Sequence, residues 1–161
     1  MQKPVRTFED FLLDVHPALQ PFVTQTHASL LEAGYRVKID MAKNGFLVSY
    51  QDAKTRRSLL NYVFRKANLV VRIYGERVGQ YLPFMETLPP SMAEAIDKAP
   101  VCRRLVTPGA CNARCPMGYD FTMRGKRHQK CRYTGFMFPL TGESAPYIKA
   151  FLAHEAAARG Q

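Results

Sequence analysis

The sequence contains no long hydrophobic run and none of the short motifs that name a reaction. No stretch reaches the ~18 apolar residues of a membrane helix, so we expect no membrane-spanning segment. The opening MQKPVRTFEDF lacks the apolar centre of a secretory signal, so we expect a cytoplasmic protein. GxSxG, a Walker loop, a dinucleotide fingerprint and HExxH are also missing. The sequence therefore favours a non-catalytic protein, with a thiol-dependent enzyme left open.

Acidic residues are scarce relative to basic ones. The 161 residues include 23 Lys and Arg but 13 Asp and Glu, which gives a formal net charge of +10. Such a field attracts anionic partners, so we expect nucleic acid, another polyanion or an acidic protein. A basic surface without a partner is the alternative reading. Composition says nothing about the oligomeric state.

Cysteine is rare, and its four positions are close together in the chain: Cys102, Cys111, Cys115 and Cys131. Thiols in the cytoplasm stay reduced, which favours metal binding or thiol chemistry over disulfides. The spacing Cys-x8-Cys-x3-Cys-x15-Cys differs from the paired CxxC pattern of many zinc sites. A hairpin over residues 119–131 would nevertheless return the last cysteine to the others. We therefore predict that all four converge on one structural metal.

Four thiolates suit zinc, and an iron–sulfur cluster is the alternative cofactor. Cys115-Pro116 resembles the Cys-Pro ending of some ferredoxin motifs. His128 could replace one cysteine as a ligand, although a histidine in a turn is more often solvated. Three other outcomes stay open: buried inert thiols, a thiol-dependent redox or small-ligand site, and two disulfides that pair the first cysteine with the second and the third with the fourth.

Basic residues flank the cysteines. Arg103 follows Cys102, Arg114 precedes Cys115, and Lys130 and Arg132 enclose Cys131. Zinc with four thiolates carries a formal charge of −2, which nearby cations offset while lowering the thiol pKa values. Part of the positive charge of the chain is therefore expected to serve the cysteine site.

Other basic residues cluster at turns, where we expect the side chains to reach into water and contact phosphate. The predicted nucleic-acid-binding residues are Arg56, Arg57, Arg124, Lys126 and Arg127. The aromatic residues Tyr119, Phe121 and Tyr133 are interleaved with the second group and could stack on bases, although we expect Phe121 to pack in the core.

Hydrophobic periodicity predicts an α+β fold in which helices cover a four-stranded antiparallel meander. We expect one domain over residues 1–161, with a cysteine-rich segment at 101–135 that contains the hairpin, and a final helix. The expected strands are 37–41, 46–50, 58–64 and 69–74. The expected helices are 8–14, 17–33, 76–82, 89–99 and 145–159.

Two stretches, GYRVKIDMAKNGFLVSY and LLNYVFRKANLVVRIYG, carry a resemblance to a known group of proteins. With the pattern Lys66…Leu69…Tyr74, they loosely resemble uncharacterised small bacterial proteins with YdhG-like domains of unknown function. The resemblance covers about half of the chain, excludes the cysteine segment, and implies an α+β fold and a bacterial cytosolic origin. It carries over no catalytic residue.

Overall fold

The chain begins with helices whose ends the sequence specifies well. The computed structural model describes residues 5–160; the expectation about a secretory leader rests partly on residues 1–4, outside this range. The Thr7 hydroxyl accepts the Asp10 N–H, and the Asp10 carboxylate accepts the Thr7 N–H. This capping box starts α1 (Phe8–Leu13). Pro17 opens a 3₁₀ turn, Pro17–Leu19, that leads into α2 (Gln20–Glu32).

The predicted antiparallel meander is confirmed. It comprises β1 (Tyr35–Ala42), β2 (Gly45–Asp52), β3 (Ser58–Arg65) and β4 (Asn68–Ile73). Alternation along β2 buries Phe46, Val48 and Tyr50 on one face. Lys43 and Asn44 form the turn from β1 to β2, and Gly45, with a φ of 132°, begins β2 opposite Ala42.

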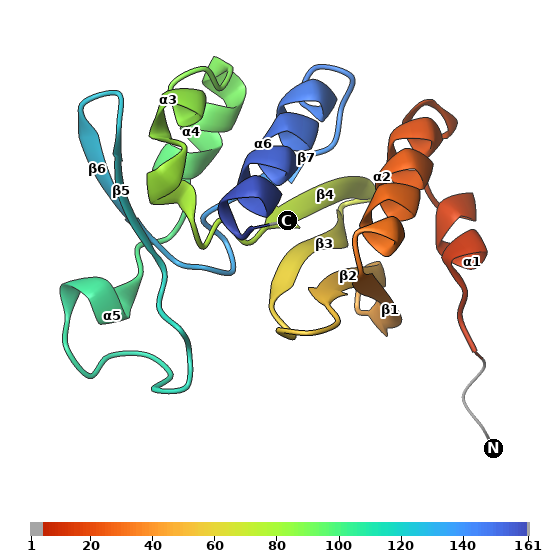
Figure 1. The fold of residues 1–161 in the computed structure, drawn as a ribbon, viewed down its shortest axis with the longest axis horizontal. Coiled ribbons are helices and arrows are strands. Elements are labelled where there is room, and N and C mark those ends of the chain that lie inside the picture. Colours follow the sequence, from red (N-terminus) through yellow and green to blue (C-terminus); the bar gives the residue numbers. More distant parts are fainter. Residues whose placement is uncertain (1–4, 161) are drawn as a thin grey trace.

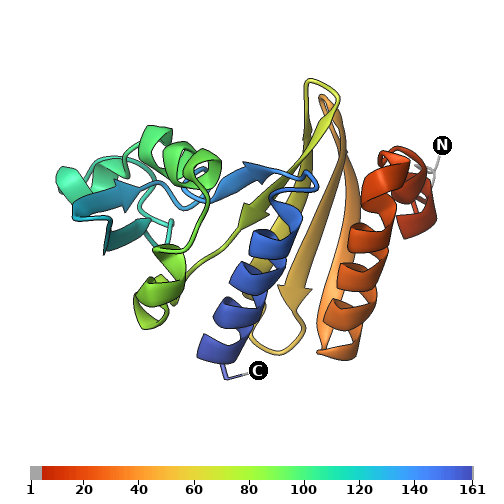
Figure 2. The same ribbon diagram turned by 90° about the horizontal axis from the view of Figure 1, so that it is seen from above.

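A fifth strand, β7 (Met137–Pro139), pairs with β4, so the sheet order is β1-β2-β3-β4-β7. Helix α6 (Ala145–Ala158) follows it and packs with α2 against the same face of the sheet (Figures 1 and 2). Ser144 precedes α6, but its hydroxyl accepts the Thr141 N–H and donates to the Pro139 carbonyl instead of capping the helix. The sequence predicted α2 as the cover of the sheet and α6 as a helix, but not β7.

The remaining elements lie beyond β4, at the other end of the molecule (Figure 1). The second sheet is the predicted hairpin of β5 (Tyr119–Met123) and β6 (Lys126–Lys130). Tyr119, Phe121 and Met123 of β5 join the core through Phe136. Within residues 5–160, no helix is both long and apolar enough to cross a membrane. The elements of this part are a 3₁₀ turn (Val78–Gln80), α3 (Leu82–Met85), α4 (Pro90–Lys98), α5 (Arg103–Val106), β5 (Tyr119–Met123) and β6 (Lys126–Lys130).

Candidate cysteine-arginine site

Backbone hydrogen bonds hold the first and last cysteines near each other. The Cys102 N–H donates to the Gln129 carbonyl at 2.8 Å, and the Cys131 N–H donates to the Pro100 carbonyl at 3.0 Å. These bonds attach the segment after α4 to the end of β6, so Cys102 and Cys131 have fixed backbones. The predicted return of the last cysteine by a hairpin is the reason for this proximity.

The other two cysteines lie on a segment that we call the thiol loop, residues 103–118. It contains α5, and none of its residues is buried. Asn112 organises its centre: the Asn112 side-chain oxygen accepts the Arg114 N–H, and the Asn112 carbonyl accepts the Cys115 N–H. Cys111 and Met117 have positive φ values of 66° and 80°, which strain residues that carry a Cβ. The thiol loop is therefore shaped by polar contacts at a cost in backbone strain.

All four cysteines line one pocket of about 350 Å³, which we call the cysteine pocket. Its described lining residues include the arginines Arg103, Arg104, Arg114 and Arg132 and no carboxylate. Cys102 is buried, Cys115 and Cys131 are half-buried, and Cys111 is exposed. The chain has only these four cysteines, and this fold gathers them around one positively charged cavity.

The four cysteines are free thiols in this structure, so neither alternative disulfide is formed. Within the described residues, no group of three or more His, Cys, Asp or Glu side chains is arranged so that it could hold a metal ion. The thiols share a cavity without converging on one point. A metal centre here would require the thiol loop to move its cysteines toward Cys102 and Cys131.

Cys111 differs chemically from an ordinary exposed cysteine. A hydrogen bond from the Asn112 backbone N–H is the main cause that lowers the pKa of the Cys111 thiol; desolvation opposes it, and Arg103 and Arg104 add to the lowering. A larger thiolate fraction favours metal coordination and also nucleophilic reactivity. The lowered pKa thus makes Cys111 a candidate both for metal coordination and for nucleophilic reactivity.

The basic side chains next to Cys131 are bound by groups other than the thiols. Lys130 is buried, and its ammonium donates to the carbonyls of Asp97 and Ala99 at 2.8 and 2.9 Å, which fastens the end of α4. The Arg132 guanidinium donates to Glu76 at 2.7 Å and lies over the Tyr74 ring. Of the flanking cations, Arg103 and Arg114, together with Arg104, remain as counter-charges for the cysteine pocket.

Glycine at position 118 lets the thiol loop join the hairpin. A Cβ placed there would lie 2.1 Å from the Lys130 carbonyl oxygen and 2.8 Å from Cβ of Cys102. Neither neighbour is the free end of a flexible side chain, so only glycine fits without a shift of the backbone. The close approach fixes the distance between the thiol loop and the two cysteines beyond it.

The basic turn of the hairpin is ion-paired. Arg127 forms a bidentate pair with Asp120, at 2.9 and 2.7 Å, and Lys126 pairs with Asp97. The Arg124 backbone N–H donates to Glu86, and its guanidinium donates to the Leu88 carbonyl. These three side chains are less available to a ligand than the sequence suggested.

The second predicted basic cluster is divided. Arg57 donates to Glu76 at 3.0 Å, whereas Arg56 is exposed in the turn between β2 and β3, with a φ of 62°. Among the aromatic residues, Phe121 is buried as expected, and Tyr133 is 46% exposed beside the cysteine pocket. His128 is not a solvated turn residue: it is 3% exposed and stacks on Phe121.

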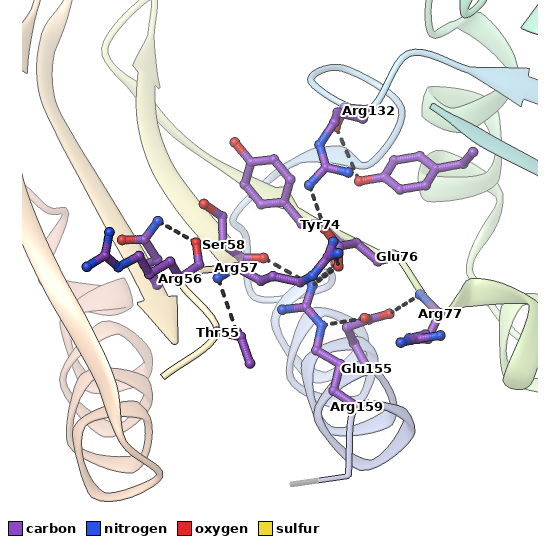
Figure 3. A network of polar contacts seen from close by, with 12 residues as sticks. Thr55, Arg56, Arg57, Ser58, Tyr74, Glu76, Arg77, Arg132, Glu155 and Arg159 are labelled. Carbon is purple, nitrogen blue, oxygen red and sulfur yellow. Dashed lines mark hydrogen bonds and ion pairs between the residues drawn. The ribbon is translucent and has the colours of Figure 1, made fainter. Parts of the chain in front are cut away.

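Sequence reasoning missed a polar network beside the cysteine pocket. Glu76 accepts hydrogen bonds from Arg57 and Arg132 and lies 3.8 Å from Arg159, as Figure 3 shows. Glu155, fully buried on α6, pairs with Arg159 at 2.6 Å. No local pattern links residues 57, 76, 132 and 155, since only the fold brings them together.

Comparison with known proteins adds no relative. No protein-family model, no curated protein sequence and no solved structure matches this chain.

Proposed function

We propose that this protein is a non-catalytic metal-binding domain whose four cysteines hold one structural zinc ion. The observation that carries the proposal is that every cysteine of the chain lines the same arginine-rich pocket. Four cysteines scattered for packing alone have no reason to share one cavity. Reduced thiols fit a bacterial cytoplasm, which we propose as the setting of this domain.

The residues present fit a zinc ion chemically. Zinc binds thiolate sulfur at ~2.3 Å in a tetrahedron, and the lowered pKa of Cys111 favours its thiolate form. Arg103, Arg104 and Arg114 would offset the −2 charge of a tetrathiolate centre. Cys102 and Cys131 are anchored by backbone bonds, so binding requires closure of the thiol loop, which has no buried residue to resist it.

An iron–sulfur cluster is the second candidate cofactor, and the size of the cavity favours it. A single zinc ion needs far less room than the pocket of about 350 Å³, whereas a cluster places several iron and sulfur atoms between its cysteines. Iron–sulfur absorption in the visible spectrum of anaerobically purified protein would select this cofactor and overturn zinc.

Elemental analysis of the full-length protein tests the metal proposal. We expect one zinc per chain, four thiols that react with a thiol reagent only after chelation, and reduced thermal stability of the chelated protein, because metal binding is linked to folding. Cys111→Ser and Cys131→Ser should each lose zinc, and Ser91→Ala, outside the pocket, should keep it. Metal-free protein with four reactive thiols would overturn the proposal and favour a thiol-dependent redox or small-ligand site.

We further propose that the domain binds nucleic acid or another polyanion through its positive surface. The net charge of +10 supports this, and Arg56 is an exposed candidate contact. Ion pairs at Arg127 and Lys126 do not exclude phosphate contacts, because exposed pairs contribute little and can exchange partners.

Binding to DNA and RNA at increasing salt tests the second proposal. Affinity should fall steeply with salt through counterion release. Replacement of Arg124, Lys126 and Arg127 by alanine should reduce the salt slope by up to about three units, if each contacts one phosphate. Absence of binding at low salt would exclude nucleic acid and leave an acidic protein as the partner to test.

A further inference from the structure

A second pocket adjoins the cysteine pocket and has a different character. It has a volume of about 280 Å³, and its lining is predominantly polar. Arg57, Arg77 and Arg132 line it, with Glu76 as its carboxylate among the described residues. Gly118 and Arg132 belong to both pockets, so the two cavities are neighbours. We call this second cavity the arginine pocket.

The arginines around this pocket outnumber the acids. One carboxylate, Glu76, and three arginines, Arg57, Arg77 and Arg132, line the pocket, and Figure 3 draws all four. The lining therefore has a formal charge of +2, although Arg57 and Arg132 each form an ion pair with Glu76. Burial opposes the charged form of Glu76, but the hydrogen bond from Arg132 and the charges of Arg159 and Arg57 lower its pKa overall. Glu76 therefore stays ionised, and the pocket has a net positive charge even with this carboxylate charged.

The pocket is built on a rigid base. The Arg132 side chain is 9% exposed, donates to Glu76 at 2.7 Å and lies 5.1 Å from the centre of the Tyr74 ring. Arg159 does not line the pocket but lies 3.8 Å from Glu76, which does; it is 8% exposed and donates to the carbonyls of Ser58 and Tyr74. The Arg132 guanidinium, fixed in this way, loses little conformational freedom when an anion binds.

Two more arginines line the pocket from solvent-exposed positions. The Arg57 side chain is 58% exposed although it donates to Glu76, and Arg77 is exposed. The Arg77 backbone N–H, and not its guanidinium, is the group bound by Glu155. Both side chains can therefore turn toward a ligand without breaking the buried base.

We propose that the arginine pocket binds the phosphate monoester group of a ligand. A phosphate monoester carries a charge of about −1.5 to −2 at neutral pH, which is opposite in sign and similar in size to the formal charge of the pocket lining. Guanidinium groups bind phosphate oxygens through paired hydrogen bonds. A cavity of about 280 Å³ accepts such a group but not a length of nucleic-acid strand. The ligand is therefore free phosphate or the terminal phosphate of a larger molecule.

The thiol loop forms one wall of this pocket through Pro116, Met117 and Gly118. Met117 lies in the strained left-handed region, with a φ of 80°. Closure of the thiol loop on a metal would set the position of this wall. The inference thus deepens the proposed polyanion binding and rests on it, by placing a terminal phosphate beside the metal centre.

Isothermal titration of the metal-loaded, full-length protein tests the proposal with three probes: inorganic phosphate, an oligonucleotide with a 5′-phosphate, and the same oligonucleotide with a 5′-hydroxyl. We expect phosphate to bind, and the 5′-phosphate to tighten oligonucleotide binding at least tenfold. Arg57→Gln and Arg77→Gln should each weaken phosphate binding about tenfold, since one charge-assisted hydrogen bond contributes roughly that much. Arg65→Gln removes the same charge from an exposed position on β3 and should leave phosphate affinity unchanged.

The outcomes separate this inference from the function on which it rests. Equal binding of both oligonucleotides, without binding of phosphate, would overturn the pocket and leave general polyanion binding intact. Phosphate binding without oligonucleotide binding would support the pocket with free phosphate as its ligand and contradict the nucleic-acid proposal. Equal loss of affinity in Arg65→Gln and Arg57→Gln would also overturn the pocket, because general charge would then explain the binding. Zinc content, measured for each variant, shows whether an effect comes from loss of metal.

Discussion

The sheet with its covering helices and the thiol loop are two differently constructed regions of one chain. Strands β2 to β4 bury many large side chains in the core, among them Tyr50, Leu60 and Tyr62. The thiol loop buries none of its residues and contains two strained non-glycine positions, Cys111 and Met117. The first region can be stable through apolar burial alone. The second has no comparable source of stability, which is why a bound metal would matter there.

Hydrogen bonding shows the same contrast. In the sheet, the backbone groups pair in regular ladders, and polar side chains are secondary. In the thiol loop, Asn112 and Arg104 supply contacts through side-chain groups and isolated carbonyls. Exposed contacts of this kind contribute little each, because water competes for every partner. The loop is thus the region in which a ligand can change the structure most.

The largest expected effect comes from placing a charge in the sheet core. Val48 is fully buried on β2, so Val48→Asp would put an unpaired carboxylate in an apolar environment, at a cost of several kcal/mol. We expect the whole chain to unfold or to lose most of its stability in chemical denaturation, including the hairpin, whose Tyr119 and Phe121 belong to this core.

Ser49→Asp is the matched control, since the next residue on β2 faces the opposite side of the sheet and is half-buried. It should remain folded with a much smaller loss. Similar denaturation midpoints for the two variants would contradict the assignment of the buried face.

Local patterns were sufficient to predict the sheet region. Alternation at Phe46, Val48 and Tyr50, and the turn signal at Lys43 to Gly45, are contained within a few residues, and the structure shows that alternation and a turn at Lys43 and Asn44. The pairing of β7 with β4 is different, because Phe138 and Val71 are far apart in the chain and β7 has only three residues. A strand of three residues is too short to show the alternation of apolar and polar residues that predicts a strand.

The sequence predicted which cysteines lie together, but not how the neighbouring side chains are arranged. The spacing of the cysteines and the hairpin indicated that the thiols would lie in one region, and all four do line one pocket. In contrast, the side chain of Arg132 was expected to serve the thiols beside Cys131, but it forms an ion pair with Glu76. A buried guanidinium is stabilised by a carboxylate, and the fold places Glu76 within reach. Such choices depend on contacts between distant residues.

An intermediate effect is expected at the junction of the two regions. Gly118→Ala would place a Cβ 2.1 Å from the Lys130 carbonyl oxygen, so the thiol loop must shift away from the hairpin. We expect a loss of about 1–3 kcal/mol in stability, a typical cost of overpacking, with cysteines that react faster with a thiol reagent. The circular dichroism of the sheet should be retained.

Gly79→Ala is the control for this substitution, because a Cβ at that position meets no atom within 4 Å. It should leave both thiol reactivity and stability close to those of the original protein. If Gly118→Ala leaves thiol reactivity unchanged, the close approach does not hold the thiol loop in place.

The smallest expected effect is a pH dependence located in the sheet region. His27 on α2 stacks on Phe8 at 3.7 Å between ring centres and shares a hydrogen bond of 2.8 Å with the Tyr50 hydroxyl. Desolvation lowers the pKa of His27 below its ordinary value, with partial opposition from the charge of Glu9. An unfolded chain, in which histidine titrates near about 6.5, therefore binds the proton at a higher pH than the folded chain does.

The sign follows from this order of protonation. The contribution of His27 to stability is fully present above a pH of about 6.5 and is lost as the pH falls toward the lowered value of the folded state. In His27→Gln, the urea midpoint should consequently fall less between about pH 7.5 and pH 5.5 than in the original protein. Part of the slope should remain, because burial also lowers the pKa of His128 in the hairpin. If His27→Gln keeps the slope of the original protein, the acid sensitivity of this protein does not originate in the sheet region, and the hairpin with His128 becomes its source.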